Sequence, residues 1–302
     1  MRNLMRAGTI LLVLAAGAAL LLAPNGVKQA AEEGLTLCVS AVLPSLFPFF
    51  VLSSLLLSLG FSEALGRFLA PFMGTLFHLS GAGAGALTLG LVGGYPAGAR
   101  AVSELYEKKR CSREEAEHLL AFCNNCGPAF FLSFLGAEQF GSVALGARLW
   151  LIHVLSALLA GLLLRPKRQL GSTPFHSSTP AAAASFSLAF VGAVQSGFSA
   201  FLCVSGFVLL FSVLLAPLKH LGASALLTGL AELFGGIAAL PPNDAGFLMA
   251  AFLTGFGGLS VHAQSMAFFL PAGLSGKWYF RGKLLQAVLS IALAAIALLL
   301  SA

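Results

Sequence analysis

Hydrophobic and polar positions divide the chain into long apolar stretches that are broken by short polar or glycine-rich motifs. Apolar runs over residues 145–164, 186–215 and 284–300 are each long enough to cross the hydrocarbon core of a bilayer. A further apolar run over residues 7–23 follows two arginines, a pattern that is also typical of a signal peptide. We expect an uncleaved first transmembrane helix there, within residues 1–26, because nothing downstream resembles a secreted domain.

Interruptions of the apolar pattern recur at matching places in the two halves of the chain. The first half carries Gly-Gly-Tyr-Pro-Ala-Gly at residues 93–98 and Asn-Asn-Cys-Gly-Pro at residues 124–128. The second half carries Leu-Pro-Pro-Asn-Asp at residues 240–244 and Gly-Gly-Leu-Ser-Val-His at residues 257–262. Non-helical backbone at membrane depth is tolerated only where it is buried in protein or lines a water-filled cavity. Matched breaks therefore predict a substrate site between two repeats.

The order of the segments predicts an all-α, polytopic membrane protein made of two inverted repeats with broken helices or re-entrant hairpins. We expect an N-terminal transmembrane helix (1–26), a first repeat (27–168), a cytoplasmic linker rich in Ser, Thr, Pro and Ala (169–185) and a second repeat (186–302). Basic residues follow the last span of the first repeat but precede the last span of the second. The positive-inside rule then predicts that these two equivalent helices cross the membrane in opposite directions.

The composition of the chain is typical of a protein that folds in a lipid bilayer. Of the 302 residues 58% are hydrophobic and only 9% are charged, whereas soluble domains carry about 25% charged residues. The net charge of +6 comes from small basic islands beside apolar spans, so we expect a lipid environment and no nucleic-acid partner. The odd number of cysteines indicates no disulfide framework, and the pair Cys123 and Cys126 lacks a second pair. Because no nucleophile–base pair or HExxH motif is present, we expect no enzyme activity, no metal and no cofactor.

The breaks supply most of the candidate ligand-binding groups. Two amides, a flexible glycine and a proline that can start a new helix follow one another at residues 124–128. A helix N-terminus at such a break offers partial positive charge and free N–H donors to a carboxylate or phosphate. A plain cytoplasmic turn between helices is the alternative. The candidate substrate-binding residues are Gly94, Tyr95, Pro96, Arg100, Asn124, Asn125, Gly127, Ser260, His262 and Gln264.

Several of these candidates have a structural alternative. Arg100 is either a bidentate donor to an anion or an ordinary cytoplasmic flank. Ser260, His262 and Gln264 place polar groups in an apolar region, where they cost free energy unless partnered, and a structural histidine bonded to a carbonyl is the alternative. Glu232 is an intramembrane acid and hence a candidate proton-coupling group or ion ligand, or else a neutral, hydrogen-bonded structural residue.

Four segments carry a family resemblance: residues 93–99, residues 103–107, residues 119–125 with 127–128, and residues 256–262. Together they resemble the YlbJ or SpoVV family of sporulation integral membrane proteins. Members contain the nucleoside-recognition or Gate domain, which is shared more distantly with concentrative nucleoside transporters and ferrous-iron transporters. The resemblance implies a role in endospore formation. It also implies transport of a small anionic substrate, dipicolinate, from the mother cell across the outer forespore membrane.

Three functions compete at this point. The leading expectation is a multi-pass secondary carrier that moves a small organic anion by alternating access around a site at the membrane midplane. A nucleoside or metal-ion carrier of the Gate type is the second. A sporulation membrane assembly factor without substrate flux is the third. The sequence leaves the oligomeric state open, with a homo-oligomer among the options.

Overall fold

The computed structural model describes residues 10, 11, 14, 17, 18, 20–22, 24–59, 61–170, 186–220 and 224–301. The regular elements of these residues are all helices, which confirms the expected all-α class. In chain order they are α2 (Pro24–Leu37), the π-helix η1 (Cys38–Val42), α3 (Leu43–Ser58), α4 (Phe61–Phe77), α5 (Gly83–Gly93), α6 (Ala97–Glu107), α7 (Arg113–Leu120), the π-helix η2 (Phe130–Gln139), α8 (Val143–Leu163), α9 (Phe186–His220), α10 (Ala225–Ala231), α11 (Leu233–Ala238), α12 (Asp244–Phe256), α13 (Gly258–Phe269) and α14 (Lys277–Leu299). The expected helix over residues 1–26 and the linker 169–185 lie mostly outside the described residues.

Several described stretches are long and apolar enough to cross a bilayer. They are Pro24–Leu56, Val143–Leu163, Phe186–Pro217, Asp244–Phe269 and Lys277–Leu299. Their number makes the chain a polytopic membrane protein, as expected. The last span differs from the prediction, because its helix begins at Lys277, two turns before the start expected from hydropathy alone. Polar residues of α14 therefore enter the interior of the molecule.

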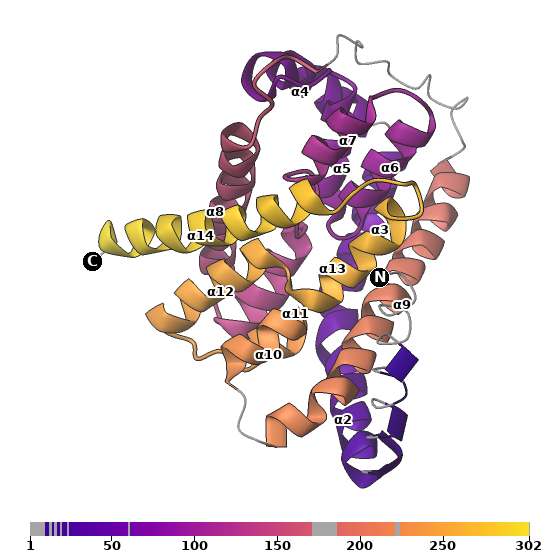
Figure 1. Ribbon diagram of the computed structural model, residues 1–302. Coiled ribbons are helices and arrows are strands. Elements are labelled where there is room, and N and C mark those ends of the chain that lie inside the picture. The colour runs from indigo at the N-terminus through magenta and orange to yellow at the C-terminus, as the bar shows by residue number, and fades with distance from the viewer. Residues whose placement is uncertain are drawn as a thin grey trace.

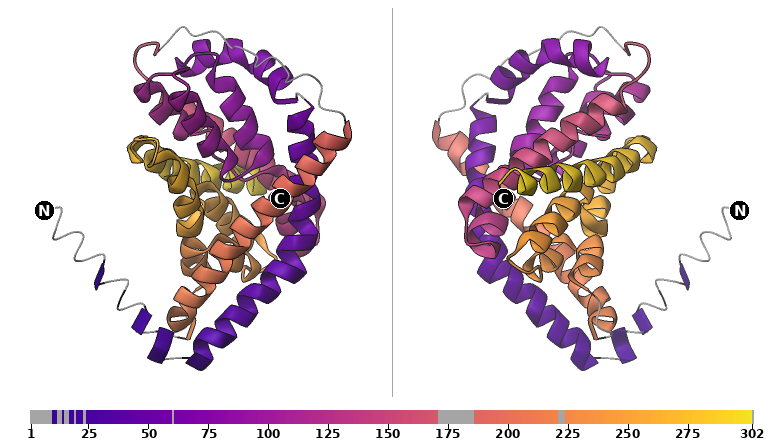
Figure 2. Two further views of the ribbon diagram at one scale, coloured as in Figure 1. Left: turned by 90° about the vertical axis from the view of Figure 1, so that its right-hand side faces the viewer. Right: turned by 90° about the vertical axis from the view of Figure 1, so that its left-hand side faces the viewer.

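The two longest helical stretches, α2–η1–α3 and α9, pack side by side as rods along one side of the molecule (Figure 2). Helix α9 has 35 residues, about 52 Å at 1.5 Å per residue, so it is longer than a hydrocarbon core of about 30 Å. Glycines allow the close approach. A Cβ on Gly34 would lie 3.0 Å from the Ser212 Cβ, and one on Gly197 would lie 2.8 Å from a Val51 methyl.

Both halves of the chain contribute to the same hydrophobic clusters. Figure 1 shows α4–α7 at the top, α14 crossing the middle and α10–α12 directly below it. Phe130 of η2 packs against Phe234 of α11 with ring centroids 5.1 Å apart. In the second cluster, first-half residues such as Phe122 join Phe269 and Tyr279 of the second half. The halves thus interlock, and the division into repeats at residues 168 and 186 stays a prediction.

The order of elements is nevertheless the same in the two halves. The helix pair α5 and α6, then α7, η2 and α8, corresponds to the pair α10 and α11, then α12, α13 and α14. The helices of the second half are also interrupted at the expected place, because residues 239–243 form a turn between α11 and α12, whose N-cap is Asn243. An additional break that the sequence did not predict lies at Glu232, between α10 and α11.

Candidate functional site

The two breaks of the first half lie directly against each other. Gly94 ends α5 with a φ of 74°, which favours glycine. A Cβ on Gly127 would lie 3.3 Å from the Gly94 Cα. One on Gly98 would lie only 1.9 Å from the Cys123 carbonyl oxygen. The small residues of both motifs are therefore needed for this backbone-to-backbone contact.

The second-half break reaches the first-half break from the other side. Gly257 and Gly258 have φ values of 102° and 74° and interrupt the candidate span Asp244–Phe269 in its middle. A Cβ on Gly258 would lie 2.9 Å from the Gly229 carbonyl oxygen of α10. One on Gly257 would lie 3.3 Å from the hydroxyl oxygen of Tyr95. The breaks of the two halves thus meet around Tyr95.

A cavity opens where the breaks meet. Its empty volume is about 520 Å³, a figure that includes the solvent in the open mouth. The lining residues are Leu46, Phe50, Ser53, Val92, Gly93, Gly94, Tyr95, Cys126, Gly127, Ala129, Phe130, Val204, Leu233, Phe234, Val261 and Gln264. Four of the candidate substrate-binding residues are among them, from both halves of the chain: Gly94, Tyr95, Gly127 and Gln264.

The two candidate asparagines do not line the cavity, but their hydrogen bonds hold the break beside it in place. Both are fully buried. The Asn124 Oδ1 accepts a hydrogen bond from the Ala99 N–H at 3.1 Å, and its Nδ2 donates to the Ser265 Oγ at 2.7 Å. The Asn125 Oδ1 accepts from the Gln286 Nε2 at 3.1 Å. The amides therefore tie the first-half break to α6 of the same half and to α13 and α14 of the second half.

Lys283 of α14 is a central residue of this network that sequence reasoning missed. Its side chain is fully buried. The ammonium donates to the Tyr95 hydroxyl at 3.1 Å and to the Gln286 Oε1 at 2.8 Å, and it lies 5.1 Å from the centroid of the Tyr95 ring. A signal was present, since Lys283, Gln286 and Ser290 are spaced as one polar face of an otherwise apolar helix.

His153 of α8 is a second buried residue that was missed. Its Nε2 accepts from the backbone N–H of Cys126 at 3.2 Å, so this amide of the break already has a partner. One turn along α8, the hydroxyls of Ser156 and Ser290 lie 2.7 Å apart and join α8 to α14. The wall behind the cavity is thus a continuous hydrogen-bonded layer.

The three polar candidates of α13, Ser260, His262 and Gln264, lie in different environments. Gln264 lines the cavity, and its Oε1 is buried without a hydrogen-bond partner among the described residues. His262 does not line the cavity: its Nδ1 lies 2.9 Å from the Tyr279 hydroxyl, and Phe256 packs edge-on with ring centroids 4.7 Å apart. Ser260 is buried but does not line the cavity. Roles for His262 and Ser260 in substrate binding stay predictions.

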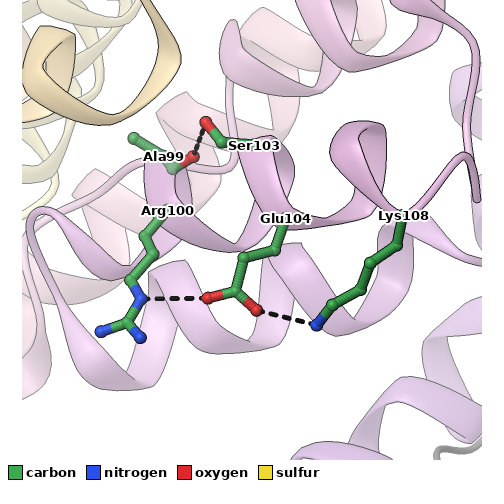
Figure 3. Close-up of polar contacts among 5 residues, drawn as sticks. All are labelled: Ala99, Arg100, Ser103, Glu104 and Lys108. Atoms are coloured by element: carbon green, nitrogen blue, oxygen red, sulfur yellow. Dashed lines mark hydrogen bonds and ion pairs between the residues drawn. The ribbon is translucent and has the colours of Figure 1, made fainter. Parts of the chain in front are cut away.

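Two further candidates lie beside the break of the first half. Pro96 directly precedes α6 as its N-cap residue. Arg100 is exposed, and its Nε donates to the Glu104 Oε1 at 3.0 Å, while Lys108 donates to the other carboxylate oxygen at 3.2 Å (Figure 3). Partial burial alone would raise the pKa of Glu104, but the hydrogen bonds from Lys108 and Arg100 outweigh it and lower this pKa. The structure does not bring Arg100 to the cavity.

Glu232 forms the first break of the second half. It is buried, and its extended backbone separates α10 from α11. Its carboxylate oxygens accept from the backbone N–H groups of Phe234 at 2.9 Å and Gly235 at 2.6 Å, so Glu232 caps the N-terminus of α11. Leu233 and Phe234 directly after it line the cavity. Its role in ion coupling stays a prediction.

Comparison with known proteins identifies the family. The Gate family, described as nucleoside recognition, matches residues 39–144, a range that includes both first-half breaks. The sporulation integral membrane protein YlbJ of Bacillus subtilis (strain 168) is 30% identical over 309 aligned positions, which cover 88% of this chain and 76% of that protein. This chain belongs to the YlbJ family of sporulation integral membrane proteins. The resemblance drawn from the motifs is thereby confirmed. No solved structure matches this YlbJ-family chain.

The Gate match accounts for only part of the cavity of this YlbJ-family protein. Leu233, Phe234, Val261 and Gln264 line the cavity from the second half, beyond the matched residues 39–144. The cavity is complete only when both halves of the chain are folded together.

Proposed function

We propose that this YlbJ-family protein is a membrane transporter for a small organic anion of the dipicolinate type. The observation that carries the proposal is the cavity around Tyr95, which is lined by the broken helices of both halves. Secondary transporters place their substrate between two repeats in this way, so that movement of one repeat against the other exposes the site to either side. Such a carrier would act in the mother-cell-derived outer forespore membrane and move the anion from the mother cell toward the forespore.

The cavity lining suits a flat aromatic anion. Phe50, Tyr95, Phe130 and Phe234 supply aromatic faces and edges against which a pyridine ring can pack. Gly94 and Gly127 have no side chains and leave backbone accessible beside the aromatic groups. The aromatic lining of the cavity thus supports a ring-containing substrate. A carboxylate on that ring would be bound by the polar groups around Tyr95.

Flux through reconstituted protein tests the proposal. Liposomes loaded with radiolabelled dipicolinate should release it in a saturable manner when they contain the wild-type protein. Ala129→Phe should slow release at least about tenfold, because Ala129 lines the cavity and the larger side chain fills it. Ala292→Phe is the matched control, since Ala292 is exposed on α14 and its release rate should equal that of the wild type. Absence of release from correctly oriented wild-type protein would favour an assembly factor.

A nucleoside carrier is the second candidate, and two observations favour it. The matched family is described as nucleoside recognition. The buried, unpartnered Oε1 of Gln264 could also accept a hydrogen bond from the edge of a nucleobase. Uridine in the same liposome assay separates the candidates: uridine release without dipicolinate release would establish the nucleoside carrier and exclude the anion carrier.

A further inference from the structure

Lys283 is a buried lysine whose ammonium donates to two neutral acceptors. Its ammonium has three protons, and two are accepted by the Tyr95 hydroxyl and the Gln286 Oε1. The side chain is completely excluded from solvent. All of the ion pairs found among the described residues lie elsewhere in the molecule. The structure thus places a lysine amine at membrane depth with no carboxylate beside it among the described residues.

The other titratable groups that face Lys283 do not supply the missing negative charge. They are the thiols of Cys123 and Cys126 in the first-half break, the imidazole of His153 in α8 and the imidazole of His262 in α13. The backbone N–H of Cys126 donates to His153, so this imidazole nitrogen acts as an acceptor and is unprotonated. An ammonium buried among such groups is strongly unfavourable unless another group compensates it.

Tyr95 is the residue that connects Lys283 to the cavity. Tyr95 lines the cavity, and its hydroxyl and ring both contact the Lys283 ammonium. The hydroxyl is also hydrogen-bonded to the thiol of Cys126. Because the hydroxyl oxygen accepts from an ammonium, its own proton becomes a stronger donor, to this thiol or to an anion that enters beside it. Cys126 and Gly127 line the cavity beside Tyr95. One side chain therefore separates the uncompensated cation from any anion that enters.

We infer that Lys283 makes the cavity selective for anions, because its positive charge acts on the cavity through the side chain of Tyr95. An entering carboxylate supplies the counter-charge that the protein lacks, and the polarised Tyr95 hydroxyl positions it. An uncharged molecule of the same shape gains neither contribution. This inference rests on the proposed transport of an organic anion and names the residue that selects it.

The test compares two probes of nearly identical shape in reconstituted full-length protein. Pyridine-2,6-dicarboxylate is dipicolinate itself, and pyridine-2,6-dicarboxamide is its uncharged counterpart. The readout is the ratio of their initial release rates, which does not depend on the amount of folded protein. The wild type should prefer the dicarboxylate by roughly tenfold or more, since a unit charge at this range in protein interacts strongly with another.

Lys283→Met removes the charge while keeping the length of the side chain, and it should bring this ratio close to one. Lys283→Arg should restore much of the preference, because it returns a cation. Lys277→Met is the matched control: Lys277 lies in the same helix but is exposed, so the ratio should equal that of the wild type. If Lys283→Met cannot be recovered from membranes, Tyr95→Phe serves as the test variant. Its preference for the dicarboxylate over the dicarboxamide should be several-fold smaller than that of the wild type.

The inference is overturned if Lys283→Met prefers the dicarboxylate as strongly as the wild type does. Where only Tyr95→Phe folds, a wild-type preference in that variant overturns it. Neither result contradicts the proposed transport of anions. Failure of the wild type to release dipicolinate, with or without release of the diamide, overturns the proposed function and the anion selectivity with it. The two failures are therefore distinguishable in one experiment.

Discussion

Replacing Gly98 by alanine tests whether the two first-half breaks are locked together by backbone contact. The added Cβ would lie 1.9 Å from the Cys123 carbonyl oxygen and 2.8 Å from the Asn124 Cα, whereas ordinary contact begins at 3.4 Å. Both neighbours are backbone atoms, so no rotamer change can relieve the contact. Helix α6 or the 124–128 segment must move by roughly 1.5 Å, the difference between the ordinary and the closest distance.

The expected loss of stability follows from opposing contributions. Alanine in place of a helical glycine is favourable by about 0.4–1 kcal/mol. Overpacking against a rigid neighbour costs about 1–3 kcal/mol or more. The hydrogen bond from the Ala99 N–H to the Asn124 Oδ1 spans the same contact, and its weakening adds about 1 kcal/mol. The net destabilisation is about 1–3 kcal/mol, which corresponds to a melting temperature lower by roughly 2–10 °C.

The assay is heating of the purified, detergent-solubilised protein followed by size-exclusion chromatography, with flux measured on the same preparation. Gly206→Ala is the control, because Gly206 lies within α9 and a Cβ there meets no atom within 4 Å. It should melt at the wild-type temperature or slightly above it. Gly98→Ala should melt lower and lose flux, since Asn124 moves with the break. Equal melting temperatures for Gly98→Ala and Gly206→Ala would refute the interlocked arrangement.

Three further substitutions examine the network around the cavity. Asn125→Ala leaves the Gln286 Nε2 without this acceptor and should abolish flux with membrane insertion intact; wild-type flux would remove Asn125 from the site. Arg100→Ala should leave dipicolinate release unchanged, because Arg100 pairs with Glu104 outside the cavity; a raised KM would return it to the site. Glu232→Gln should lower the melting temperature by a few degrees, since a carboxamide cannot accept from both capped N–H groups and a lost cap costs about 1 kcal/mol. A changed pH dependence of flux in Glu232→Gln would support ion coupling.

The breaks were predictable from sequence wherever glycine carries them. Glycine is the residue that populates positive φ without strain, and Gly94 and Gly257 adopt such angles at the expected places. The break at Glu232 has another cause. There the chain leaves the helix in an extended conformation, and a buried carboxylate caps the new helix. An acid within an apolar run predicts a functional or structural group but not a helix end, so the sequence predicted the break before α12 and missed the one at Glu232.

The direction in which Lys283 points could not be deduced from its neighbours in the sequence. Lys277, Arg281 and Lys283 form one basic island along the chain, and the positive-inside rule treats such an island as a flank. In the helix these residues lie at different angles around the axis, so Lys277 and Arg281 are exposed and Lys283 is buried. Only the polar residues one and two turns later on the same face, Gln286 and Ser290, distinguish the buried lysine.

The prediction that α8 and α14 cross the membrane in opposite directions does not depend on Lys283. Lys277 and Arg281 remain at the N-terminal end of α14. That end lies beside the C-terminal end of α8: His118 contacts the Leu164 carbonyl oxygen at 3.1 Å and packs on Trp278 with ring centroids 4.1 Å apart. Equivalent helices that cross in the same direction would separate these ends by the thickness of the bilayer, about 30 Å. Their proximity is the arrangement expected of inverted repeats, and it lets α14 bring Lys283 against Tyr95, which lines the cavity between the two halves.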